Sequence, residues 1–213
     1  MTITGVPFHP NTPTDNGCFQ ASLRMVLEYF RPERSYTWSE LDTLTAHTGD
    51  STWPMAGALF CQSLGFAVTW IDGFDLAEFT RRGYEYLRSY YGQAIADTQR
   101  RHSDLDQERR FAGEVVERLA PQVRVPTRDD LKSCIVVGSP VICNVNGRAL
   151  SRQQGYMGHF VVVYGIGEDG VQLHDPGLPP APDRCVDWAT FDDAWSYPDR
   201  RYRNLLALSL PPR

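Results

Sequence analysis

The chain has 213 residues, with 21 lysines and arginines against 26 aspartates and glutamates, and a formal net charge of −5 at neutral pH. This length fits one domain with a sizeable core, and the mildly acidic balance excludes a general affinity for nucleic acid or for an anionic membrane surface. No apolar run approaches the roughly 18 residues of a membrane span, and the first ten residues lack the basic and apolar regions of a secretory signal.

The first predicted helix carries a cysteine at its start. An Asn-Gly turn signal at 16–17 precedes apolar residues that recur at helical spacing over 21–30, and Pro32 ends the pattern. Cys18 is therefore expected in the first turn, where unpaired N–H groups and the helix dipole stabilise an anion such as a thiolate. A small buried thiol at a helix start explains the same pattern, because free cysteine is usually buried.

Shorter elements follow. Thr37 and Glu40 form a capping box, which predicts a helix over 38–46. Pro54 and Gly65 bracket a second helix, and residues 66–71 predict a strand.

The segment 75–120 is charge-rich, and two apolar stripes at helical spacing predict a helical hairpin with its connection near 100–106. This insert is expected to pack on the core. A plain structural pair is favoured over a lid or a substrate-recognition element.

The second half of the chain predicts mostly strands. Thr127 caps a helix that ends near Val137, and strands are expected at 140–145, 159–164 and 171–175. A short Gly/Asp turn between the last two indicates an antiparallel hairpin. A helix at 190–195 and a strand at 205–210 complete the chain. The predicted class is α+β: a single domain over 1–213, with N-terminal helices packed on a C-terminal antiparallel sheet.

The hairpin brings two polar residues together. His159 begins one strand and Asp175 ends the next, so an imidazole and a carboxylate meet at one end of the sheet. With Cys18 as nucleophile, this arrangement is that of a nucleophile, a base and an orienting acid. Considered alone, His159 could equally be a histidine buried in the core, and Asp175 could serve only to form a turn. His174 should point to the opposite face and is interpreted as structural.

Other residues carry weaker signals. The five cysteines (18, 61, 134, 143 and 185) are odd in number and form no CxxC pair, which argues against a disulfide framework or a zinc ribbon and favours free thiols in a cytoplasmic, reducing compartment. Trp53, Tyr156 and Trp195 either line a groove or pack in the core, and packing is favoured.

Two parts of the sequence are similar to a known family. The segment 17–27, GCFQASLRMVL, resembles the Cys-Gly-Pro-Ala-Ser helix of the C39-like branch of papain-like cysteine peptidases. GHFVVVYG at 158–165 and VQLHDP at 171–176 resemble the Gly-His-(Phe/Tyr)-Val-Val-Val and Asp-Pro pair of that branch, and SPVI at 139–142 resembles its Pro-Val-Ile element. The match covers most of the chain outside 75–120.

The resemblance implies a papain-like fold with Cys18 as nucleophile, His159 as base and Asp175 as its orienter. The sequence departs from the family at 18–20, where Cys-Phe-Gln replaces Cys-Gly-Pro. It departs again where the family supplies an oxyanion-hole glutamine about six residues before the cysteine. Thr12 occupies that place, and Asn11 is the first candidate for the missing amide donor, with Asn16 or Gln20 as substitutes.

The implied activity is that of an intracellular cysteine peptidase or amidase that acts through an acyl-enzyme on a peptide or amide substrate. It needs no metal and no organic cofactor. An acyltransferase, in which an amine acceptor replaces water, and a non-catalytic peptide-binding module are the alternatives. No nucleic acid or membrane partner is expected, and the sequence does not indicate an oligomeric state.

Overall fold

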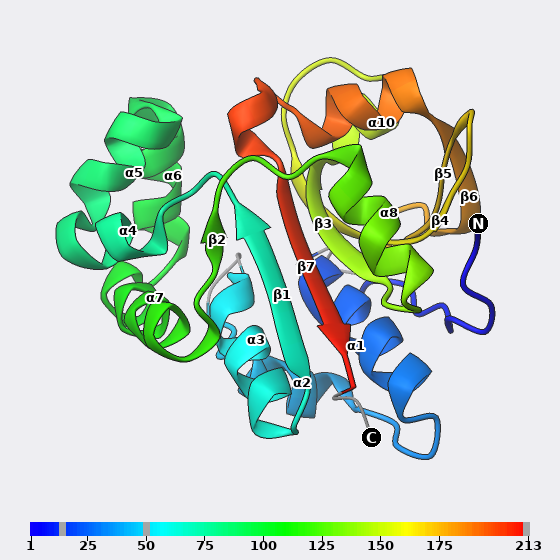
Figure 1. Cartoon of the computed structure of the whole chain (residues 1–213). Helices are drawn as coiled ribbons and strands as arrows, with labels where there is room; N and C mark the ends of the chain where they lie inside the picture. Colours follow the sequence, from blue (N-terminus) through cyan, green and yellow to red (C-terminus); the bar gives the residue numbers. More distant parts are fainter. Residues whose placement is uncertain (13–15, 49–51, 211–213) are drawn as a thin grey trace.

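A computed structural model describes residues 1–12, 16–48 and 52–210 (Figure 1). Its described part contains one seven-stranded sheet in the order β2-β1-β7-β3-β4-β5-β6. Neighbouring strands are antiparallel except β1 and β2. The strands are β1 (Ala67–Asp72), β2 (Gln122–Val123), β3 (Val141–Asn146), β4 (Gly158–Ile166), β5 (Gly170–Asp175), β6 (Ala181–Asp187) and β7 (Asn204–Ser209).

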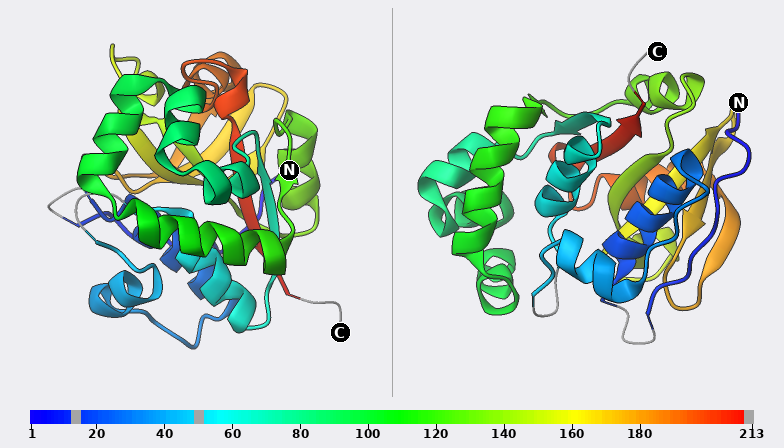
Figure 2. Two further views of the ribbon diagram at one scale, coloured as in Figure 1. Left: turned by 90° about the vertical axis from the view of Figure 1, so that its left-hand side faces the viewer. Right: turned by 90° about the horizontal axis from the view of Figure 1, so that it is seen from below.

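Helices cover both faces of this sheet, and a further group lies beyond the edge formed by β2 and β1 (Figures 1 and 2). One face carries α1 (Cys18–Phe30), α2 (Trp38–Leu44) and α3 (Pro54–Ser63), and the other carries α8 (Arg128–Val136), α9 (Gly147–Leu150) and α10 (Trp188–Trp195). Strand side chains alternate between the two cores: Phe160 and Val162 face α1, whereas Val161 and Val163 face α8 and α10. The predicted α+β class is confirmed. The sheet also contains β1 and β2, which come earlier in the sequence than the other five strands.

Helix α1 runs from Cys18 to Phe30, so Cys18 lies in the first turn, as predicted. Leu23, Met25 and Leu27 are fully buried, and the helix packs against β4. Its burial fixes the position of the Cys18 backbone relative to the strand that carries His159.

The insert differs from the predicted hairpin. It contains α4 (Leu76–Arg82), α5 (Tyr84–Tyr91), α6 (Gln93–His102) and α7 (Leu105–Leu119). The extra breaks fall at Gly83 and Gly92, whose φ angles of 53° and 86° lie in the left-handed region that glycine adopts most easily. Apolar residues can keep helical spacing along the sequence even where the chain changes direction between two short helices. The periodicity of apolar residues therefore could not predict the helix breaks at Gly83 and Gly92.

Strand β6 is absent from the sequence-based prediction. Pro179, Pro180 and Pro182 mask its strand signal. Because β6 is the edge strand of the sheet, a proline that cannot donate to a partner strand is tolerated there. This strand supplies Arg184, which contributes to the site described below.

The cap of α8 is a first test of the fold. The Asp130 N–H donates to Thr127 Oγ1 (3.3 Å), and Asp130 Oδ2 accepts from the Thr127 N–H (2.7 Å). Thr127→Ala removes the hydroxyl, and we expect the free energy of unfolding in urea to fall by about 1 kcal/mol. Thr43→Ala, on the exposed side of α2, is the matched control and should change it by less than about 0.5 kcal/mol. Equal losses in both variants would show that the cap adds nothing.

Candidate active site

The structure brings Cys18, His159 and Asp175 together. Cys18 is the first residue of α1, His159 lies at the start of β4, and Asp175 is the last residue of β5. The Nε2 atom of His159 lies 2.7 Å from Asp175 Oδ1, and the Cys18 side chain is close enough to the same imidazole to raise its pKa. The antiparallel pairing of β4 and β5 therefore produces the contact that the sequence pattern predicted.

Both carboxylate oxygens of Asp175 accept hydrogen bonds. Oδ1 accepts from His159 and from the Gly177 N–H (3.0 Å), and Oδ2 accepts from Arg184 Nη1 (2.8 Å). Sequence reasoning missed Arg184, because it lies on the masked edge strand β6. Its guanidinium also donates to the Leu150 carbonyl, so Asp175 is held from a second side.

Gly177 allows the chain to pass close to this pair. A Cβ atom there would lie 2.9 Å from Asp175 Oδ1 and 3.2 Å from His159 Nε2. The Asp-Pro-Gly turn that the sequence predicted is thus a steric requirement of the site as well as the end of a strand.

The hydrogen bonds fix the protonation of the pair. Since the Asp175 carboxylate only accepts, His159 Nε2 carries a proton, and Nδ1 is the nitrogen left for Cys18. Burial opposes the imidazolium form, but the hydrogen bonds to Asp175 and Cys18 and their negative charges outweigh it and raise the His159 pKa to about 10. Burial likewise opposes the Asp175 carboxylate, yet the His159 hydrogen bond and charge lower its pKa. The geometry favours an ionised His159–Asp175 pair.

The three candidates for the oxyanion amide lie in different surroundings. Asn11 Oδ1 accepts from the Gly17 and Thr12 N–H groups (2.9 and 2.8 Å) and so stabilises the turn before α1. Gln20 is fully buried and donates to Thr52 Oγ1 (3.0 Å). Asn16 lines a cleft together with Cys18.

The departure at Phe19 is accommodated by a glycine on a neighbouring helix. Phe19 is fully buried, and its ring lies 5.0 Å from that of Phe160. A Cβ at Gly57 of α3 would meet Phe19 Cε1 at 2.8 Å, so only glycine leaves room for this ring. The family's small residue after the cysteine is thus replaced here by an aromatic one that packs into the core.

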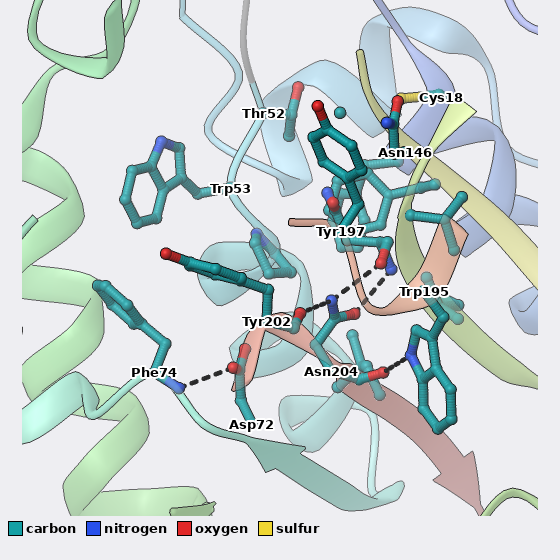
Figure 3. A pocket seen from close by; sticks show the side chains of 18 of the residues that line it. Cys18, Thr52, Trp53, Asp72, Phe74, Asn146, Trp195, Tyr197, Tyr202 and Asn204 are labelled. Atoms are coloured by element: carbon teal, nitrogen blue, oxygen red, sulfur yellow. Dashed lines mark hydrogen bonds between the residues drawn. The ribbon is translucent and has the colours of Figure 1, made fainter. Parts of the chain in front are cut away.

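A cleft of about 270 Å³ begins at Cys18 and extends across β3, β7 and β1 to the helical insert (Figure 3). Trp53, Tyr156 and Trp195 all line it, although Trp195 is almost fully buried. The favoured interpretation of packing therefore holds for Trp195, which belongs to the core, whereas the groove alternative describes the exposed Tyr156, and Trp53 both lines the cleft and packs against the core.

The structure also shows the surroundings of His174 and of two further cysteines. His174 Nε2 lies 3.0 Å from the Val6 carbonyl and its ring packs on Tyr164, consistent with a structural role. Cys61 and Cys143 are buried in the core, and burial raises the pKa of the Cys61 thiol to about 12. Among the residues that the structure describes, no group of three His, Cys, Asp or Glu side chains is arranged to hold a metal, and no helix is long and apolar enough to span a bilayer.

Comparison with known proteins identifies the family. None of the curated protein sequences matches the chain significantly. Among solved structures, the peptidase domain of Streptococcus ComA, a bifunctional ABC transporter involved in quorum sensing, aligns with 98% of this chain and 100% of its own at 15% identity and a TM-score of 0.50, which shows a shared fold. The Peptidase_C39 like family matches residues 3–201. Because that match covers nearly the whole sequence, the chain belongs to the Peptidase_C39 like family.

Proposed function

We propose that this member of a cysteine peptidase family is a hydrolase that cleaves a peptide or amide bond through an acyl-enzyme on Cys18. The observation that supports this most directly is the position of His159, which hydrogen-bonds to Asp175 and whose pKa is raised by the Cys18 side chain. A nucleophile, a base and an orienting carboxylate in this order supply the groups that acyl transfer requires.

Each residue has a defined step. The Cys18 thiolate attacks the carbonyl carbon, forming a C–S bond and placing the negative charge on the carbonyl oxygen. As this tetrahedral intermediate collapses, the C–N bond breaks and the His159 imidazolium gives its Nδ1 proton to the leaving amine. Water then attacks the thioester while His159 accepts a proton, and the acid and free Cys18 are released. Asp175 keeps the ring oriented throughout.

The oxyanion needs two donors. The Cys18 N–H at the start of α1 is one, because the first N–H groups of a helix have no partner within it. Of the side-chain candidates, Asn16 lines the cleft beside Cys18 and accepts from Thr12 through its Oδ1, whereas the Gln20 amide already donates to Thr52; we therefore assign the second donor to Asn16.

Three alanine or methionine variants test this assignment. Asn16→Ala should lower kcat by roughly 10²–10³, the usual effect of losing one oxyanion donor. Asn11→Ala and Gln20→Met should mainly lower the midpoint of urea unfolding, because both side chains bond within the fold. If Asn11→Ala alone lowers kcat at an unchanged midpoint, Asn11 is the donor instead.

Product analysis tests the activity itself. The protein is incubated with a library of peptides of defined sequence, and new termini are read by mass spectrometry, with Cys18→Ala as the matched control. Cleavage by the wild type only supports the hydrolase, and new amides that form when a simple amine is added support the transferase. Binding without cleavage supports the peptide-binding module.

A further inference from the structure

The cleft next to Cys18 has a distinctive charge pattern. Among its lining residues in the described part of the chain, Asp72 is the only one with an ionisable acidic or basic side chain apart from the cysteine and tyrosines. No lysine, arginine or histidine among the described residues forms an ion pair with Asp72. The described lining therefore offers one carboxylate and no basic side chain; the nearby Arg201, whose guanidinium lies 4.8 Å from the Tyr202 ring centroid, pairs with Asp199 and not with Asp72.

Asp72 is the last residue of β1, at the corner where the chain turns into the insert. Its Oδ1 accepts the Phe74 N–H at 2.8 Å. Burial raises the pKa of this carboxyl to about 7, although the Phe74 N–H and the Trp70 side chain act in the opposite direction. An asparagine would accept the Phe74 N–H equally well, so the turn itself does not require a charge.

Aromatic rings line the same end of the cleft as this carboxylate. The rings of Phe74 and Tyr91 are stacked with centroids 5.5 Å apart, and those of Tyr91 and Tyr202 are stacked at 5.2 Å. Trp53 meets Phe74 edge-on at 6.3 Å, and all four residues line the cleft. Figure 3 shows Asp72, Phe74 and Tyr202 close together, well separated from Cys18. We call these five residues the acidic aromatic end of the cleft.

We propose that the acidic aromatic end binds a cationic side chain of the peptide substrate, lysine or arginine, through the Asp72 carboxylate and the aromatic rings that line this end of the cleft. An ammonium or guanidinium group would give Asp72 the partner that the fold does not supply. Aromatic faces attract the same cations through their negative quadrupole. An acidic side chain would be repelled. This inference rests on the proposed function, because it assigns a substrate class to that site.

The position of the cleft indicates which part of the substrate it holds. His159 protonates the leaving amine, so that group departs on the side of β4 and β5, where His159 and Asp175 lie. The acyl part of the substrate then extends in the opposite direction from Cys18, across β3 and β7 towards β1. Asp72 at the end of β1 therefore contacts a side chain of the acyl part.

Covalent probes with a single changed side chain test the proposal. Peptidyl acyloxymethyl ketones react by thiolate displacement of a carboxylate: a C–S bond forms and a C–O bond breaks. Each acyl-side position carries lysine, arginine, norleucine or glutamate in turn, and intact mass gives the rate of Cys18 labelling. At one position we expect lysine or arginine to react roughly 10- to 100-fold faster than norleucine, and glutamate to react slowest.

Variants identify the source of this preference. Asp72→Asn keeps the acceptor for the Phe74 N–H and removes the charge, so the lysine-to-norleucine ratio should fall to near one. Glu168→Gln removes one charge at an exposed position on the β4–β5 turn and should leave the ratio as in wild type. Should Asp72→Asn fail to fold, Trp53→Leu, which removes one of the aromatic rings that line the cleft, should reduce the ratio.

The outcomes separate this proposal from the proposed function. A wild-type ratio near one at every position, or a ratio that survives Asp72→Asn, overturns the cation site even if Cys18 reacts rapidly with iodoacetamide. If Cys18 is unreactive towards every reagent, the hydrolase proposal fails. Equilibrium binding of lysine and norleucine peptides to the Cys18→Ala protein then decides the cation site, which requires tighter binding of the lysine peptide.

Discussion

Replacing His159 with alanine is expected to abolish turnover, lowering kcat by roughly four to six orders of magnitude, because nucleophile and base act as one unit. The imidazolium interacts with the Cys18 side chain, and in the proposed mechanism it also supplies the proton for the leaving group. The same substitution should remove any reactivity of Cys18 beyond that of an ordinary exposed thiol.

Alkylation by iodoacetamide measures this effect without a known substrate. The rate at each cysteine is read by peptide mass from pH 5 to 9, and exposed Cys185 serves as the internal control in the same molecule. In wild type, Cys18 should react far ahead of Cys185 at pH 6, where an ordinary thiol is almost fully protonated. In His159→Ala this lead should vanish, and Glu168→Gln should retain it.

A different result would redirect the interpretation. If wild-type Cys18 reacts no faster than Cys185 at pH 6, the thiolate–imidazolium pair is not formed in the isolated protein. The peptide-binding module would then explain the intact cleft better than the hydrolase does.

Removal of the Asp175 carboxylate should produce the second largest effect. Asp175→Ala leaves His159 Nε2 and Arg184 without their shared acceptor, so we expect kcat to fall by roughly 10²–10⁴ and the free energy of unfolding by about 3–5 kcal/mol. Asp175→Asn keeps an oxygen for the His159 N–H and should lose less of both. If Asn and Ala lose kcat equally, the negative charge matters more than the orientation of the ring.

The stability of this pair should depend on pH in a defined way. The His159 pKa is raised from 6.5 to about 10, so its contribution is complete below 6.5 and is lost as the pH rises towards 10. The Asp175 pKa is lowered from 3.8, so its contribution is present above 3.8 and is lost as the pH falls below that value.

Urea unfolding of wild type and Asp175→Asn at pH 3, 5.5 and 9.5 measures this dependence. The difference between the two proteins should be largest at pH 5.5 and smaller at both extremes. A difference that is constant from pH 3 to 9.5 would show that the ion pair does not contribute to stability.

Local sequence determined the parts of this protein that depend on neighbours along the chain. The Asn-Gly turn followed by helical periodicity fixed the start of α1 at Cys18, because a helix start is set by its own first residues. The two apolar strands with a short turn between them predicted the contact of His159 with Asp175, since antiparallel pairing defines which ends meet. The α+β class and the family followed from the same segments.

Only the tertiary structure decided the features that depend on distant segments. The prolines before and within β6 prevented its prediction as a strand. An edge strand tolerates a residue without an N–H group, whereas a central strand does not, and β6, which carries Arg184, is an edge strand. Asp72, Tyr91 and Tyr202 come from β1, the insert and the segment before β7, and no local pattern relates them. Local rules describe elements one at a time, whereas a cleft is formed by side chains that meet only after the elements have packed. The candidate nucleophile, base and acid could therefore be read from the sequence, but the surface that selects a substrate could not.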